Sequence, residues 1–135
     1  MADADIDRLA ERRPLSPHLT IFKPIMTMMM SIAHRITGVG LYGGMALLAL
    51  FLLGAGVGGG AFSAVSWIAT GFIGNVLVVM IVWAIFHHLL GGVRHALWDR
   101  GLYMDPKGRE LVAQGTLVGG ILLTLLIFIL KTLAS

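Results

Sequence analysis

The chain has 135 residues, of which 57% are hydrophobic and 13% charged, and its mean hydropathy is +0.88. A soluble domain of this size buries only about two-thirds of the surface that its unfolded chain exposes. The composition therefore excludes a water-soluble single domain and predicts an all-α membrane protein. Ten Lys and Arg against seven Asp and Glu give a formal charge of +3, no cysteine is present to form disulfides or ligate clusters, and no nucleic-acid-binding motif is found.

The first segment, residues 1–25, is expected to be a solvated arm on the cytoplasmic side. Its first 14 residues carry four acids and no apolar run. This pattern fits neither a secretory signal nor an acid-poor transit peptide.

The remainder, residues 26–135, is expected to be one anchor domain of three transmembrane helices. Residues 36–86 contain no Asp, Glu, Lys or Arg, and this run of 51 residues is long enough for two crossings of about 20 residues each. The glycine cluster at 54–60 predicts the turn between helices at about 26–53 and 63–98. A third helix, at about 109–133, follows the polar segment 99–110.

The distribution of basic residues predicts the orientation in the membrane. Five of the ten lie at or before Arg35, four lie between Arg94 and Arg109, and only Lys131 follows the uncharged stretch 111–130 of the last helix. By the positive-inside rule, the N-terminus and the second loop face the cytoplasm and the C-terminus faces the periplasm of a bacterial inner membrane.

Two clusters of polar residues interrupt the apolar helices. Ser31 and Arg35 are four residues apart on one helical face, with His34 beside them, so a hydroxyl and a guanidinium can converge on one polar ligand. An ionisable side chain within a membrane helix usually marks a site. The alternative is that Arg35 only extends to the lipid headgroups.

The second cluster places His88, Gly92 and His95 on one face of the second helix, at spacings of four and seven residues. A histidine next to a glycine that removes side-chain bulk, with arginines nearby for propionates, is a candidate axial haem ligand. A histidine that serves only helix packing is the alternative, and Gly91 and Gly92 could equally be packing glycines. Because the two helices are antiparallel, both clusters are expected at the same depth.

Three sequence blocks carry a resemblance to a known family. They are RPLSPHL at 13–19, SIAHRITG at 31–38, and HLLGGVRH at 88–95 followed by Asp99. Together they resemble the cytochrome b subunit, the larger membrane anchor of succinate dehydrogenase. The resemblance covers about residues 13–105, and the third helix matches only in being apolar.

The resemblance implies a four-subunit succinate:ubiquinone oxidoreductase, with no complete site for succinate oxidation in this chain. A flavoprotein with FAD and an iron–sulfur subunit would be its partners, and a second small anchor would share haem b with it. His88 matches the axial ligand, although His87 is adjacent to it, and His34, Arg35 and His95 match the surroundings of the haem propionates. The residues that match the ubiquinone pocket are Ser31 and Arg35, with Ile32 as an apolar wall.

Three other functions remain as alternatives. Buried Arg and His could line the path of a channel or transporter, but the expected helices show no repeat and no break within the membrane. A purely structural anchor would need neither Ser31 nor His88. An anchor of a fumarate reductase would run the same chemistry in the opposite direction.

Overall fold

The computed structural model describes residues 23–134, which form four helices and no strand. The helices are α2 (Met26–Val57), α3 (Gly59–Thr70), α4 (Phe72–Asp99) and α5 (Pro106–Leu133). Three of them, α2, α4 and α5, are long and apolar enough to cross a membrane. This confirms an all-α membrane protein with three spans. Most of the predicted N-terminal arm lies outside the described residues.

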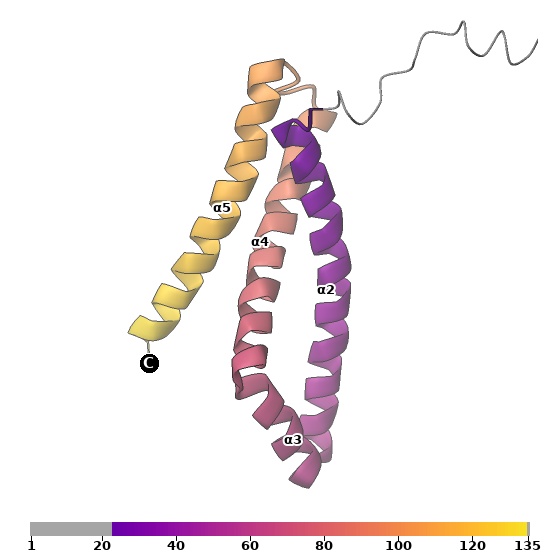
Figure 1. Ribbon diagram of the computed structural model, residues 1–135, viewed down its shortest axis with the longest axis vertical. Coiled ribbons are helices and arrows are strands. Elements are labelled where there is room, and N and C mark those ends of the chain that lie inside the picture. The colour runs from indigo at the N-terminus through magenta and orange to yellow at the C-terminus, as the bar shows by residue number, and fades with distance from the viewer. Residues whose placement is uncertain (1–22, 135) are drawn as a thin grey trace, which may run out of the picture.

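The central helix of the bundle is α4, which packs against both α2 and α5. Figure 1 shows α2 and α4 running side by side in opposite directions, and α5 diverging from α4 toward the C-terminus. The start of α2 and the loop between α4 and α5 lie at one end of the molecule, and the connection from α2 to α3 lies at the other (Figure 1). The two polar clusters are therefore at the same end, as their antiparallel placement predicts.

The polarity of the bundle is the reverse of that of a soluble domain. Among the described residues, three apolar side chains are buried and about forty large apolar ones are exposed. The buried polar side chains are Thr37, His87, Arg94, Thr116 and Thr124. An apolar exterior suits lipid and partner helices, and most of the buried side chains named here are polar.

The first helix is longer than the sequence suggests. It continues through Gly54 and Gly56 to Val57, and within the 54–60 cluster only Gly58 and Gly59 have positive φ angles, of 72° and 58°. Glycine lowers helix propensity in water, but within a membrane a helix keeps its backbone groups hydrogen-bonded. The predicted turn at 54–60 is therefore reduced to its two left-handed glycines.

The expectation of one continuous helix over 63–98 is wrong, because the chain breaks between α3 and α4 at Gly71. The break exposes carbonyl groups, and the Asn75 amide donates to those of Thr70 and Gly71 at 2.9 and 3.0 Å. These bonds satisfy the backbone where helix hydrogen bonding is interrupted. The break lies at the opposite end of α4 from the polar cluster, so it does not support the channel or transporter alternative.

The third helix begins at Pro106, three residues before the expected start. Asp105 precedes it as the N-cap, and its carboxylate accepts a hydrogen bond from the Gly108 backbone N–H at 3.0 Å. The Thr27 hydroxyl donates to the Glu110 carboxylate at 3.1 Å, which ties the beginning of α2 to the beginning of α5. These contacts fix the end of the bundle that carries the polar clusters.

Candidate functional site

Three of the predicted histidines lie together between α2 and α4. The rings of His34 and His88 are stacked, with centroids 3.9 Å apart and planes at 5°. The ring of His95 lies 5.4 Å from that of His34, at 54°. The structure therefore joins the histidine of the first cluster to those of the second in one group.

The surroundings of His88 determine which of its ring nitrogens is available to a ligand. Its Nδ1 lies 3.1 Å from the carbonyl oxygen of His34 and 3.4 Å from the Thr37 hydroxyl. Because a carbonyl oxygen can only accept, Nδ1–H is the donor of this bond, and in a neutral ring the lone pair is then on Nε2. A neutral histidine with a free Nε2 is the form that binds a metal.

The adjacent glycines of α4 have different roles. A Cβ on Gly91 would overlap the ring of His34, so this glycine is needed for the close approach of α2 to α4. A Cβ on Gly92 would have no atom within 4 Å, and Gly92 is exposed beside His88 and His95. Gly91 is thus a packing glycine, and Gly92 leaves open space along the histidine face.

Replacing Gly91 by alanine should destabilise the chain, whereas the same change at Gly92 should not. Overpacking at Gly91 costs about 1–3 kcal/mol, and both changes gain up to about 1 kcal/mol of helix propensity. The test is the thermal loss of helicity of the detergent-solubilised chain, measured by circular dichroism. A Gly91→Ala chain that melts no lower than the Gly92→Ala chain would contradict the close packing of α2 and α4.

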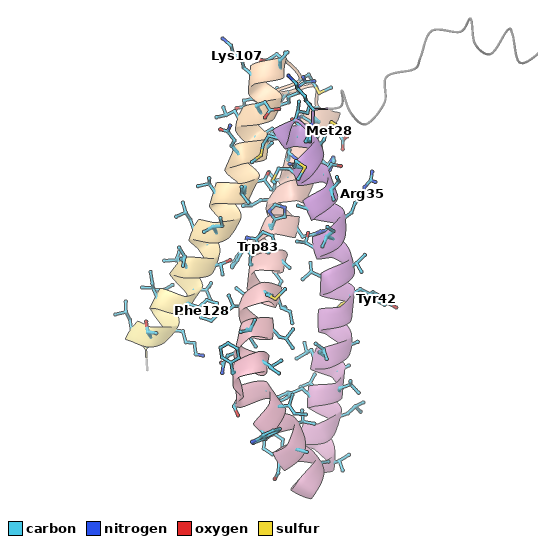
Figure 2. The ribbon with its side chains drawn as sticks, viewed as in Figure 1. Met28, Arg35, Tyr42, Trp83, Lys107 and Phe128 are labelled. Carbon is cyan, nitrogen blue, oxygen red and sulfur yellow. The ribbon has the colours of Figure 1, made fainter. Side chains whose placement is uncertain are left out.

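The predicted quinone residues lie at the outer side of α2. Ser31 is half-buried, Arg35 is exposed, and the side chain of Ile32 is 52% exposed. Figure 2 shows Arg35 projecting from α2 away from α4. Within residues 23–134, neither Ser31 nor Arg35 makes a side-chain hydrogen bond or ion pair. The structure therefore does not bring Arg35 to the histidine group.

Among the described residues, Arg94 and His87 are the largest fully buried side chains. His87 was not predicted as a site residue, and Arg94 was predicted only as one of the arginines near His88. Arg94 is 1% exposed; its Nη2 donates to the Met30 carbonyl at 3.4 Å, and its guanidinium lies over the Trp98 ring at 5.2 Å. His87 is fully buried, stacks on Trp83 at 4.9 Å, and lies against Gly120 of α5. In Figure 2, Trp83 is labelled on the side of α4 that faces α5. His87 therefore points away from the histidine group.

A signal for these residues was present in the sequence. His87, Gly91 and Arg94 recur at spacings of four and seven residues, parallel to His88, Gly92 and His95. The helix thus carries two polar stripes about 100° apart. The structure shows that the first stripe is buried in the bundle and that two of the three members of the second, Gly92 and His95, are exposed.

The composition of the histidine group limits which kind of metal centre it could bind. Residues 23–134 contain no group of three or more His, Cys, Asp or Glu side chains that could hold a metal ion. A haem brings its own equatorial nitrogens and needs only axial ligands from protein. A single histidine with a free Nε2, beside open space at Gly92, fits a haem and does not fit an isolated ion.

Comparisons with known proteins agree with this chemistry. A family model described as "Succinate dehydrogenase/Fumarate reductase transmembrane subunit" matches residues 10–128. The chain is 32% identical to the succinate dehydrogenase cytochrome b556 subunit of Paracoccus denitrificans, over 93% of this chain and 95% of that protein. It is 33% identical to the b556 subunit of Rickettsia conorii, over 87% and 92%. With the mitochondrial cytochrome b560 subunit of Mus musculus it is 36% identical, over 68% and 56%.

Proposed function

The chain belongs to the succinate dehydrogenase/fumarate reductase transmembrane subunit family, and from this membership we propose that it binds haem b together with a second anchor subunit and forms part of a ubiquinone reduction site. In this function it passes electrons from succinate oxidation to quinone. The relatives named above are all subunits of succinate dehydrogenase, which favours succinate oxidation over fumarate reduction.

The observation that carries the haem proposal is the hydrogen bonding of His88. Its Nδ1 is occupied by the His34 carbonyl, so Nε2 is the nitrogen left for an axial bond. Gly92 leaves space beside it, and His95 lies on the same face. His34 and His95 would lie near the propionates, whereas Arg35, which projects away from α4, would not. When bound, the haem supplies one-electron redox chemistry, and the second anchor would supply its other axial ligand.

The quinone proposal depends on hydrogen-bond donors in an apolar setting. Reduction of a quinone to a quinol takes two electrons and two protons, and charge develops on the two carbonyl oxygens. Ser31 offers a hydroxyl, Arg35 offers a charged guanidinium, and Ile32 offers an apolar surface. The absence of internal partners for Ser31 and Arg35 among residues 23–134 supports this role. Side chains of partner subunits would complete the pocket.

The proposed function can be tested by identifying the subunits that copurify with this chain. A complex purified through a tag on this chain should contain a flavoprotein with FAD, an iron–sulfur protein and a second small anchor. It should also absorb in the Soret region, as a haem protein does. A preparation that lacks both the haem and the flavoprotein would contradict the proposal and favour a structural anchor.

We further propose an orientation with the N-terminus and the 100–105 loop in the cytoplasm and the C-terminus in the periplasm. Nine basic residues lie at or before Arg109 in the first turn of the last span, one lies near its end at Lys131, and an odd number of spans puts the termini on opposite sides. Membrane-impermeant labelling of single cysteines should modify position 102 only in inverted vesicles and position 135 only in intact spheroplasts. The reverse pattern would overturn the orientation.

A further inference from the structure

Three contacts with α2 fix the ring of His88. The His34 carbonyl and the Thr37 hydroxyl both face Nδ1, and the His34 ring stacks on one of its sides. At Gly38, an added Cβ would stand 3.0 Å from Cε1 of the same ring, so only glycine allows this approach without a shift. The first turns of α2 thus define both the position and the tilt of a side chain that belongs to α4.

The Thr37 hydroxyl can accept from His88 while it remains bonded to its own helix. It lies 3.0 Å from the Ala33 carbonyl and 2.9 Å from the His34 carbonyl, and its single proton goes to one of them. Its lone pairs remain for the N–H of His88. Thr37 is only 4% exposed, so water does not compete strongly for this bond.

We infer that Thr37 and the His34 carbonyl are a positioning pair for the axial haem ligand, which hold the proton on Nδ1 of His88 and direct Nε2 to the iron. The inference rests on the proposed haem function. Acceptors on the distal N–H make a histidine ligand more basic and fix its orientation. A more basic ligand stabilises the oxidised iron more than the reduced iron, so Thr37 holds the haem midpoint potential below the value it would otherwise have.

The test is a comparison of Thr37→Val with Thr37→Ser in the intact complex. Valine keeps the shape of threonine and removes the hydroxyl, whereas serine keeps the hydroxyl. In a redox titration, the ratio of oxidised to reduced haem at a fixed potential should fall roughly two- to tenfold in Thr37→Val. The midpoint potential should therefore rise, and the low-spin EPR signal should shift. Thr37→Ser should resemble the unmodified complex in both measurements.

A Thr37→Val complex that carries haem with an unshifted potential and EPR signal would overturn the inference. If this variant does not load haem, the inference is tested instead by proton ENDOR of the oxidised haem in the unmodified complex. A proton on the distal nitrogen of this chain's axial histidine supports the inference, and its absence overturns it. Low-spin haem that persists in His88→Leu would instead refute the ligand proposed above, so the two failures are distinguishable.

Discussion

Replacement of His88 by leucine should remove low-spin haem from the purified complex, whereas the same replacement of His87 should leave it in place. His88 presents Nε2 beside the open space at Gly92, while His87 is turned toward α5 and stacks on Trp83. Leucine has nearly the bulk of histidine and has no nitrogen to offer. A structural role alone would make the fully buried His87 the more sensitive of the two positions.

The measurement is the haem content per complex, together with the reduced-minus-oxidised spectrum and the low-spin EPR signal. The two variants share helix, depth and substitution, so they differ only in the face from which the ring is removed. If haem were lost in His87→Leu and retained in His88→Leu, the axial ligand would have to be reassigned to His87, on the buried stripe of α4. If both variants lost haem, retention of the flavoprotein would show whether each complex had still assembled.

Replacement of Arg35 by leucine should lower succinate-to-quinone turnover by about tenfold or more, because it removes a charge-assisted donor to the quinone oxygen. Ser31→Ala removes a neutral hydrogen bond and should cost at most about tenfold. Arg35→Lys keeps the charge without the planar fork and should restore activity only in part. Turnover with a dye that takes electrons before they reach the membrane should stay unchanged in all three.

The matched control for Arg35 is Arg100→Leu, which removes an exposed arginine from the loop after α4 at the same end of the bundle. If loss of surface charge were the cause, both variants would lose quinone turnover equally. An intact complex in which Arg35→Leu retains full quinone turnover and inhibitor sensitivity would remove Arg35 from the site. That outcome would favour the alternative in which this side chain only reaches the headgroups.

The sequence patterns were sufficient to predict the three membrane spans and the shared depth of the two polar clusters. The long uncharged run implies two antiparallel crossings, and this alone places His34 and His88 at one depth. The break at Gly71 could not be predicted, because glycine is tolerated in membrane helices and only Asn75 marked the position. Hydrogen bonding of an amide to exposed carbonyls is a local geometry that hydropathy does not report.

The sequence also could not show which of the two polar stripes of α4 is buried. His87 and His88 head two stripes of identical spacing, and only the positions of α2 and α5 decide which stripe is enclosed. Thr37 was overlooked for a related reason. A hydroxyl within a helix usually bonds to the carbonyl one turn earlier, and its second contact across to α4 appears only when both helices are in place.

The burial of Arg94 also has a consequence for biogenesis. Within residues 23–134, the one hydrogen bond that its guanidinium makes is to the Met30 carbonyl, which belongs to α2. An arginine in a membrane helix costs about 2.5–3.5 kcal/mol on insertion scales when nothing compensates it. Arg94 loses this partner if α4 stands apart from α2, so we expect the two helices to associate as a hairpin before α4 settles at its final depth.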